Sequence, residues 1–113
     1  MITVNMMIRV SSQKCSKAFQ LINIIIGTIQ SVKGLISCKA YQDIDDEDTL
    51  VMIQKWESGE VMERYIKSAN YRAVMDLLEL SCEQPEVSFD TVSGTMGMKY
   101  LNAVRGNSSE ANL

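Results

Sequence analysis

The first third of the chain carries two hydrophobic periods in succession, and each predicts one element. Apolar side chains occupy every second position over residues 2–10, the pattern of a strand with one buried face. Over residues 15–29 the apolar positions recur at spacings of three and four, which predicts an amphipathic helix. Ser11 and Ser12 offer an N-cap for this helix, and Gly34 offers a left-handed residue after its end.

The rest of the chain predicts three more strands and an interrupted helical stretch. The strands are expected at residues 35–43, 49–57 and 86–93. Before the last strand, Ser58 can cap a helix that bends near residues 68–70, where Asn70 offers a second cap. Pro85 cannot continue a helix, so the helical stretch must end before it.

An acidic run at residues 45–48 separates two of the predicted strands. Its like charges would repel one another if they were buried, which indicates an exposed hairpin turn. The run lacks the glycine and the terminal glutamate of an EF-hand loop, so it does not predict a calcium site.

The element order is β-α-β-β-α-β, which predicts an α+β fold of the ferredoxin-like type with a four-stranded antiparallel sheet. Helices would cover one face of this sheet. The apolar side chains of Met7, Leu35 and Tyr41 are then expected on the other face. An apolar sheet face marks an interface, so we expect a homodimer in which two sheets pack face to face.

The chain is expected to form one domain over residues 1–93, followed by a C-terminal extension over residues 94–113. The polar end of the extension predicts partial flexibility. Within the extension, residues 98–104 are expected to form a short helix or strand that packs on a partner.

Composition excludes several classes of function. The 113 residues carry a formal net charge of −3 with scattered basic residues, so we expect no nucleic-acid partner. The N-terminus lacks the regions of a signal peptide, and no apolar stretch approaches the roughly 20 residues that span a bilayer. We therefore expect a cytoplasmic protein with no membrane contact. Cys15, Cys38 and Cys82 form no CxxC motif, which predicts reduced thiols and no bound metal.

Three aromatic residues occur where a sheet and its covering helix can jointly enclose a pocket. Trp56 ends the third predicted strand, and Tyr65 and Tyr71 follow on the helical stretch. Each side chain joins an apolar body to one polar group, which suits an aromatic ligand that bears a hydroxyl. The alternative for all three is packing in the core between helix and sheet.

Across roughly residues 2–93 the chain resembles the antibiotic biosynthesis monooxygenase family. The features that carry the resemblance are a strand, a long helix, Gly34 before the second strand, an acidic hairpin and the helix entry Trp56-Glu57-Ser58. The resemblance implies a dimeric α/β barrel.

The resemblance also implies site residues. Many members place a histidine, or a tryptophan in the haem-degrading branch, nine residues after the tryptophan, where this chain has Tyr65. A further aromatic residue commonly follows six residues later, where this chain has Tyr71. Trp56 and Tyr65 are therefore expected to line any pocket, with Tyr71 and Asn5 as further candidates for binding a substrate.

For function, the resemblance implies cofactor-independent monooxygenation of a small aromatic or quinol substrate. The chain contains no histidine, so no unperturbed side chain titrates near neutrality and no general base is identified. A non-catalytic dimeric module that binds a small ligand or serves in stress response is therefore an alternative. Haem handling is a third possible function. Met75 matches the position of the iron-binding histidine of the haem-degrading branch, but it also fits the apolar face of its helix. Asn5 is offset by one residue from the asparagine of that branch.

Overall fold

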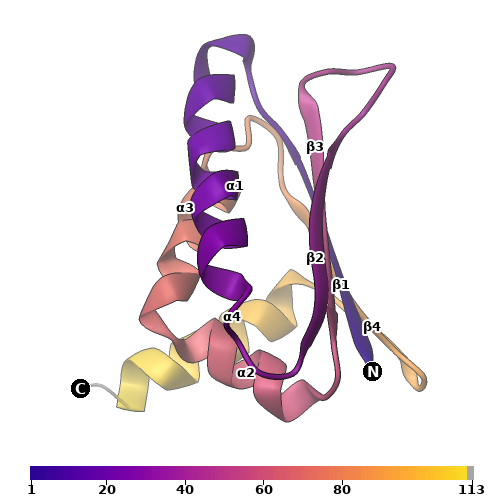
Figure 1. The fold of residues 1–113 in the computed structure, drawn as a ribbon, viewed down its shortest axis with the longest axis vertical. Helices are drawn as coiled ribbons and strands as arrows, with labels where there is room; N and C mark the ends of the chain where they lie inside the picture. The colour runs from indigo at the N-terminus through magenta and orange to yellow at the C-terminus, as the bar shows by residue number, and fades with distance from the viewer. Residues whose placement is uncertain (112–113) are drawn as a thin grey trace.

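The computed structural model describes residues 1–111, with side chains through residue 106. It consists of a five-stranded antiparallel sheet and helices that lie on one side of it (Figure 1). The strands are β1 (Ile2–Arg9), β2 (Leu35–Gln42), β3 (Thr49–Trp56), β4 (Glu86–Thr91) and β5 (Gly94–Met96), arranged in the order β2-β3-β1-β4-β5. The helices are α1 (Cys15–Ile29), α2 (Gly59–Lys67), α3 (Arg72–Glu79) and α4 (Met98–Ala111).

The predicted order of elements is confirmed over the first four strands, and the bounds of α1 agree with the predicted range. Alternate side chains of β1 and β3 face the helices and form the sheet side of the core. The buried ones are Val4, Met6, Ile8, Leu50, Met52, Gln54 and Trp56. The helices add a matching set that includes Ala18, Ile25, Ile29, Ile66, Val74 and Leu78. The intervening strand residues form a second face that no described helix or strand covers (Figure 1); we call it the open face.

The predicted bend in the second helical stretch is confirmed. A short 3-10 turn, Ala69–Tyr71, separates α2 from α3. Ser58 caps α2 as predicted, because its hydroxyl accepts a hydrogen bond from the backbone N–H of Val61 at 3.4 Å. The other predicted caps are wrong. Ser11 precedes a 3-10 turn, not α1 itself, and its side chain makes no capping hydrogen bond. Asn70 lies inside the 3-10 turn before α3 and does not cap that helix.

The prediction of four strands is also wrong, because the chain reverses after β4 and adds a fifth. Gly94 has a φ of 150°, a backbone region that favours glycine, and the hydroxyl of Thr91 donates to its carbonyl oxygen at 3.1 Å. Residues 94–96 then pair with residues 89–91. This strand is three residues long, too short to show a hydrophobic period in the sequence.

A β-bulge changes the expected open face. The register between β2 and β3 shifts between Leu35 and Ser37, which turns Leu35 toward Trp56 and the core. The prediction that places Leu35 on the open face is therefore wrong. Met7 and Tyr41 do lie on that face, where 41% and 50% of their surfaces are exposed.

The segment after β5 packs on its own chain. α4 contacts α2 and β4, and it buries Leu101 completely. The ring centroid of Tyr100 is 5.0 Å from that of Phe89, and its hydroxyl donates to the carboxylate of Glu63. Contact of this segment with a partner stays a prediction. Flexibility of the chain end stays a prediction, and residues 112–113, on which it partly falls, lie outside the described residues.

Among the residues that the structure describes, no helix has both the length and the apolarity needed to cross a bilayer.

Gly34 is predicted to be indispensable where the turn after α1 meets α2. Its φ is 94°, and a Cβ at this position would lie 2.7 Å from Cγ1 of Val61. Gly34→Ala should therefore lower the free energy of unfolding by at least about 1–2 kcal/mol, measured by urea denaturation. Gly27→Ala is the control, because a Cβ added at this position of α1 would have no neighbour within 4 Å. It should stabilise the fold by about 0.5–1 kcal/mol, and equal effects of the two changes would contradict the prediction.

Candidate functional site

Trp56, Tyr65 and Tyr71 come together in one aromatic cluster on the helix-facing side of the sheet. Trp56 is the last residue of β3, Tyr65 lies in α2 and Tyr71 ends the turn before α3. The ring centroids of Trp56 and Tyr65 are 5.3 Å apart, and those of Tyr65 and Tyr71 are also 5.3 Å apart. No more than 3% of any of these side chains is exposed. Three candidates from the sequence therefore share one enclosed environment.

The polar groups of this aromatic cluster differ in how they are satisfied. The indole Nε1 of Trp56 donates to Oε1 of the buried Gln54 at 3.1 Å. The hydroxyls of Tyr65 and Tyr71 are buried without a hydrogen-bond partner among the described residues. A buried hydroxyl that lacks a partner costs about 1–3 kcal/mol. Both hydroxyls can therefore gain free energy by binding a polar group of a ligand or a water molecule.

Burial also fixes the protonation of the two tyrosines. It is the main reason that the pKa of each hydroxyl lies well above its ordinary value. The nearby Cys38 raises the pKa of Tyr65 further, whereas Arg105 partly opposes the rise in the pKa of Tyr71. At neutral pH both hydroxyls stay protonated, so they act as hydrogen-bond donors and not as bases.

The sequence analysis missed two polar residues that come from the sheet. Gln54 is 2% exposed and occupies a position between Met52 and Trp56 on the buried face of β3. Cys38 lies opposite Gln54 in the register of β2 and β3. The sequence did contain a signal for Gln54, because it occupies one of the alternate positions of its strand that are otherwise apolar and buried. Cys38 gave none, because the bulge after Leu35 decides which face it joins.

A third missed residue, Arg105, reaches the aromatic cluster from α4. Its guanidinium carbon lies 5.3 Å from the centroid of the Tyr71 ring, within cation–π range. Its Nη1 donates to the carbonyl oxygen of Ser68 at 3.0 Å and also to that of Ile66. Arg105 thus holds α4 against the C-terminal end of α2 and closes the Tyr71 side of the aromatic cluster.

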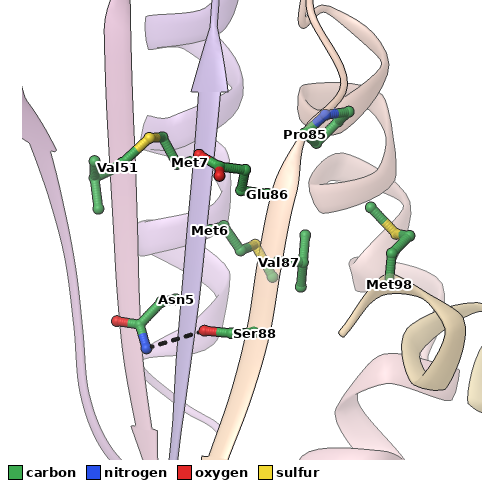
Figure 2. A pocket seen from close by; sticks show the side chains of 9 residues that line it. All are labelled: Asn5, Met6, Met7, Val51, Pro85, Glu86, Val87, Ser88 and Met98. Carbon is green, nitrogen blue, oxygen red and sulfur yellow. Dashed lines mark hydrogen bonds between the residues drawn. The ribbon is translucent and has the colours of Figure 1, made fainter. Parts of the chain in front are cut away.

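Asn5, the fourth candidate, lies on the other face of the sheet. Its Nδ2 donates to Oδ2 of Asp90 at 2.8 Å and to Oγ of Ser88 at 3.4 Å, and Figure 2 shows the second of these bonds. With Met7 and Val51 it lines a groove of about 630 Å³ that also reaches Val87 and Met98. The sheet therefore separates Asn5 from the aromatic cluster, as its one-residue offset in the sequence suggests.

The described residues do not fit a haem ligand set. The chain contains no histidine, and Met75 is partly buried against the hydrophobic core. Over residues 1–106, moreover, no three acidic or thiol side chains come close enough to hold a metal ion.

Fold and site together define a class of protein. It is a small α+β domain in which helices cover one face of an antiparallel sheet, with aromatic side chains and unpaired hydroxyls enclosed between the two layers. Aromatic walls with a few polar groups are typical of sites for small organic ligands.

Comparison with known proteins identifies the family. The family whose sequence profile is described as antibiotic biosynthesis monooxygenase matches residues 1–77, more than half of the chain. The chain therefore belongs to the antibiotic biosynthesis monooxygenase family, which confirms the resemblance noted in the sequence. No curated protein matches it significantly.

Solved structures share the fold at low sequence identity. A conserved protein from Methanosarcina mazei Go1 is 21% identical, with a TM-score of 0.73, and the match covers 79% of this chain and 89% of that one. An antibiotic biosynthesis monooxygenase is 12% identical, with a TM-score of 0.73 and coverage of 81% and 98%. A protein from Mycobacterium tuberculosis is 18% identical, with a TM-score of 0.73 and coverage of 80% and 92%. These similarities establish the fold alone.

The thiol of Cys38 predicts a loss of stability at alkaline pH. Burial raises its pKa from 9.0 to about 11 in the folded protein. The neutral thiol therefore contributes its full stability below pH 9, and this contribution is lost as the pH rises from 9 to 11, because the unfolded chain ionises first. Urea denaturation across this range should give a shallower pH dependence for Cys38→Ala than for the wild type. Cys82→Ala, which removes an exposed thiol, is the control; if it flattens the curve equally, Cys38 is not the cause.

Proposed function

We propose that this protein binds a small aromatic or quinol substrate at the aromatic cluster and catalyses its monooxygenation without a cofactor. The observation that carries the proposal is the pair of buried hydroxyls, on Tyr65 and Tyr71, that find no hydrogen-bond partner within residues 1–106 and lie between aromatic walls. Membership in the antibiotic biosynthesis monooxygenase family supports the type of reaction.

The substrate is the electron source in this reaction. For a methylene group activated by an aromatic ketone, one oxygen atom of O₂ becomes a new carbonyl and the other leaves as water with the hydrogens of the methylene. The protein has to favour the substrate anion, orient it and exclude bulk water. Hydroxyls that stay protonated at neutral pH are suited to donate hydrogen bonds to the anionic oxygen.

Binding without turnover is the second candidate function. This function is favoured because the aromatic cluster offers no general base. Burial raises the pKa of Tyr65 and of Tyr71, so both hydroxyls stay protonated at neutral pH, and the chain has no histidine. A substrate with an acidic methylene or phenol can ionise in solution and bind as the anion, which removes the need for a protein base. A substrate that ionises only at high pH would be bound and not oxidised.

Oxygen consumption with a panel of quinols and anthrones, in the absence of metal and flavin, tests the proposed activity. Tyr65→Phe and Tyr71→Phe should each raise the thermal midpoint, because each change removes a buried hydroxyl that has no protein partner among the described residues. Each should lower turnover by about tenfold or more through the lost hydrogen bond to the anion.

Tyr65→Ala is the packing control for this experiment. Removal of the buried ring should cost about 3–5 kcal/mol of stability. If Tyr65→Phe retains full turnover while Tyr65→Ala is strongly destabilised, Tyr65 is a packing residue and leaves the proposed site.

We also propose that the protein is a homodimer that buries the open face. Met7, Val51 and Tyr41 occupy one row across this face, since the strand registers place them opposite one another. Basic side chains lie toward one edge of the face and acidic ones toward the other: Lys39 and Lys55 on β2 and β3, Glu86 and Asp90 on β4. A two-fold axis parallel to the strands would bring the basic edge of one copy onto the acidic edge of its partner.

The homodimer predicts a sedimentation result. The wild type at micromolar concentration should sediment as a dimer, with an interface of at least about 1,000 Å² in total. Ile53→Glu, in the middle of the open face, should shift the protein toward the 12.7 kDa monomer. Ile24→Glu makes the same change at an exposed apolar position of α1 and should leave the dimer intact. A wild type that sediments only as the monomer would refute this arrangement.

A further inference from the structure

A recess of about 250 Å³ lies between the turn that follows α1 and helix α2, on the helix side of the sheet. Lys33 from the turn and Arg64 from α2 line it, and Ser68 and Asn70 add polar groups beyond the end of α2. Tyr65 also lines the recess. Tyr65 is therefore shared between the recess and the aromatic cluster, so the recess adjoins the buried rings.

The charged side chains that line this recess are basic. Lys33 and Arg64 are both exposed, and neither forms an ion pair within residues 1–106. Arg72, by contrast, is neutralised by Asp76 at 2.9 Å. Two unpaired cations beside one recess, in a chain with a net charge of −3, favour an anionic ligand.

The dimensions of the recess limit the ligand. Sites for drug-sized ligands have volumes of about 300–1,000 Å³, so 250 Å³ suits a single aromatic ring better than a fused system. Tyr65, whose buried hydroxyl has no hydrogen-bond partner among the described residues, adds a preference for a ligand with a polar group at its inner end.

We propose that this recess binds a single-ring hydroxyaromatic carboxylate. Its carboxylate would pair with Lys33 and Arg64 at the surface, and its ring hydroxyl would point toward Tyr65 and the aromatic cluster. The inference rests on the proposed function in that it places the ligand's inner end at the aromatic cluster, but it requires binding alone and no oxidation.

A matched pair of probes tests the proposal. 4-Hydroxybenzoate and 4-hydroxybenzamide have nearly the same shape, and only the first is anionic at neutral pH. Trp56 is the one tryptophan of the chain, and its ring centroid lies 5.3 Å from that of Tyr65, so its fluorescence should respond to binding. Isothermal calorimetry gives an independent affinity. We expect 4-hydroxybenzoate to bind about five- to tenfold more tightly than the amide, and less tightly as salt is added.

The double variant Lys33→Gln/Arg64→Gln should reduce the affinity for 4-hydroxybenzoate to that for the amide and leave amide binding unchanged. Lys14→Gln/Lys17→Gln removes the same charge near the other end of α1 and should retain wild-type affinity for both probes. Equal affinity of the wild type for the two probes would overturn the proposal. An unchanged affinity for 4-hydroxybenzoate in the Lys33→Gln/Arg64→Gln variant would also overturn it. So would a result in which neither probe binds at millimolar concentration.

The outcomes separate this inference from the proposed activity. Charge-dependent binding without oxygen consumption for any substrate would refute the monooxygenase activity and leave the recess assigned. Oxygen consumption with neutral quinols, together with no preference for the anionic probe, would support the activity and refute the recess as an anion site.

Discussion

The antiparallel pairing of β1 with both β3 and β4 is the constraint on which the remaining structure depends. Residues 2–9 pair along their whole length with residues 49–56 on one side, and residues 3–7 pair with residues 86–90 on the other. Because a strand points its side chains alternately to opposite faces, this pairing aligns the buried residues of three strands on one face. The helices must then cover that face, and the end of β3 must lie beneath α2. The aromatic cluster forms at this junction, where Trp56 meets Tyr65.

The aromatic cluster combines tight burial with incomplete hydrogen bonding. The rings of Trp56, Tyr65 and Tyr71 contribute apolar area and favourable ring contacts, which stabilise the core. The hydroxyls of the two tyrosines oppose this, because burial without a partner has a free-energy cost that phenylalanine would avoid. The proposed ligand would offset this cost by accepting hydrogen bonds from the two hydroxyls. Arg105 closes the Tyr71 side through α4, whereas Tyr65 adjoins the recess beside Lys33 and Arg64.

The two faces of the sheet divide the proposed roles of the protein between them. The helix-facing side encloses the aromatic cluster, and the open face carries a row of apolar side chains between basic and acidic edges. Asn5 belongs to the open face, where Asp90 and Ser88 accept hydrogen bonds from its amide. One sheet thus carries the proposed ligand site on one side and the proposed dimer interface on the other, since adjacent strand residues point to opposite faces.

The sequence by itself determined the first four strands and the helices between them, their order, the bend before Tyr71 and the grouping of Trp56, Tyr65 and Tyr71. These features follow from hydrophobic periods and turn residues that lie within a few positions of one another. Tertiary structure decided the fifth strand, the inward turn of Leu35 and the contact of Arg105 with Tyr71. The direction of Leu35 depends on a bulge set by pairing with β3, and Arg105 reaches Tyr71 only because α4 folds back over α2. Such contacts join segments that are distant in the chain, so no local pattern of residues can encode them.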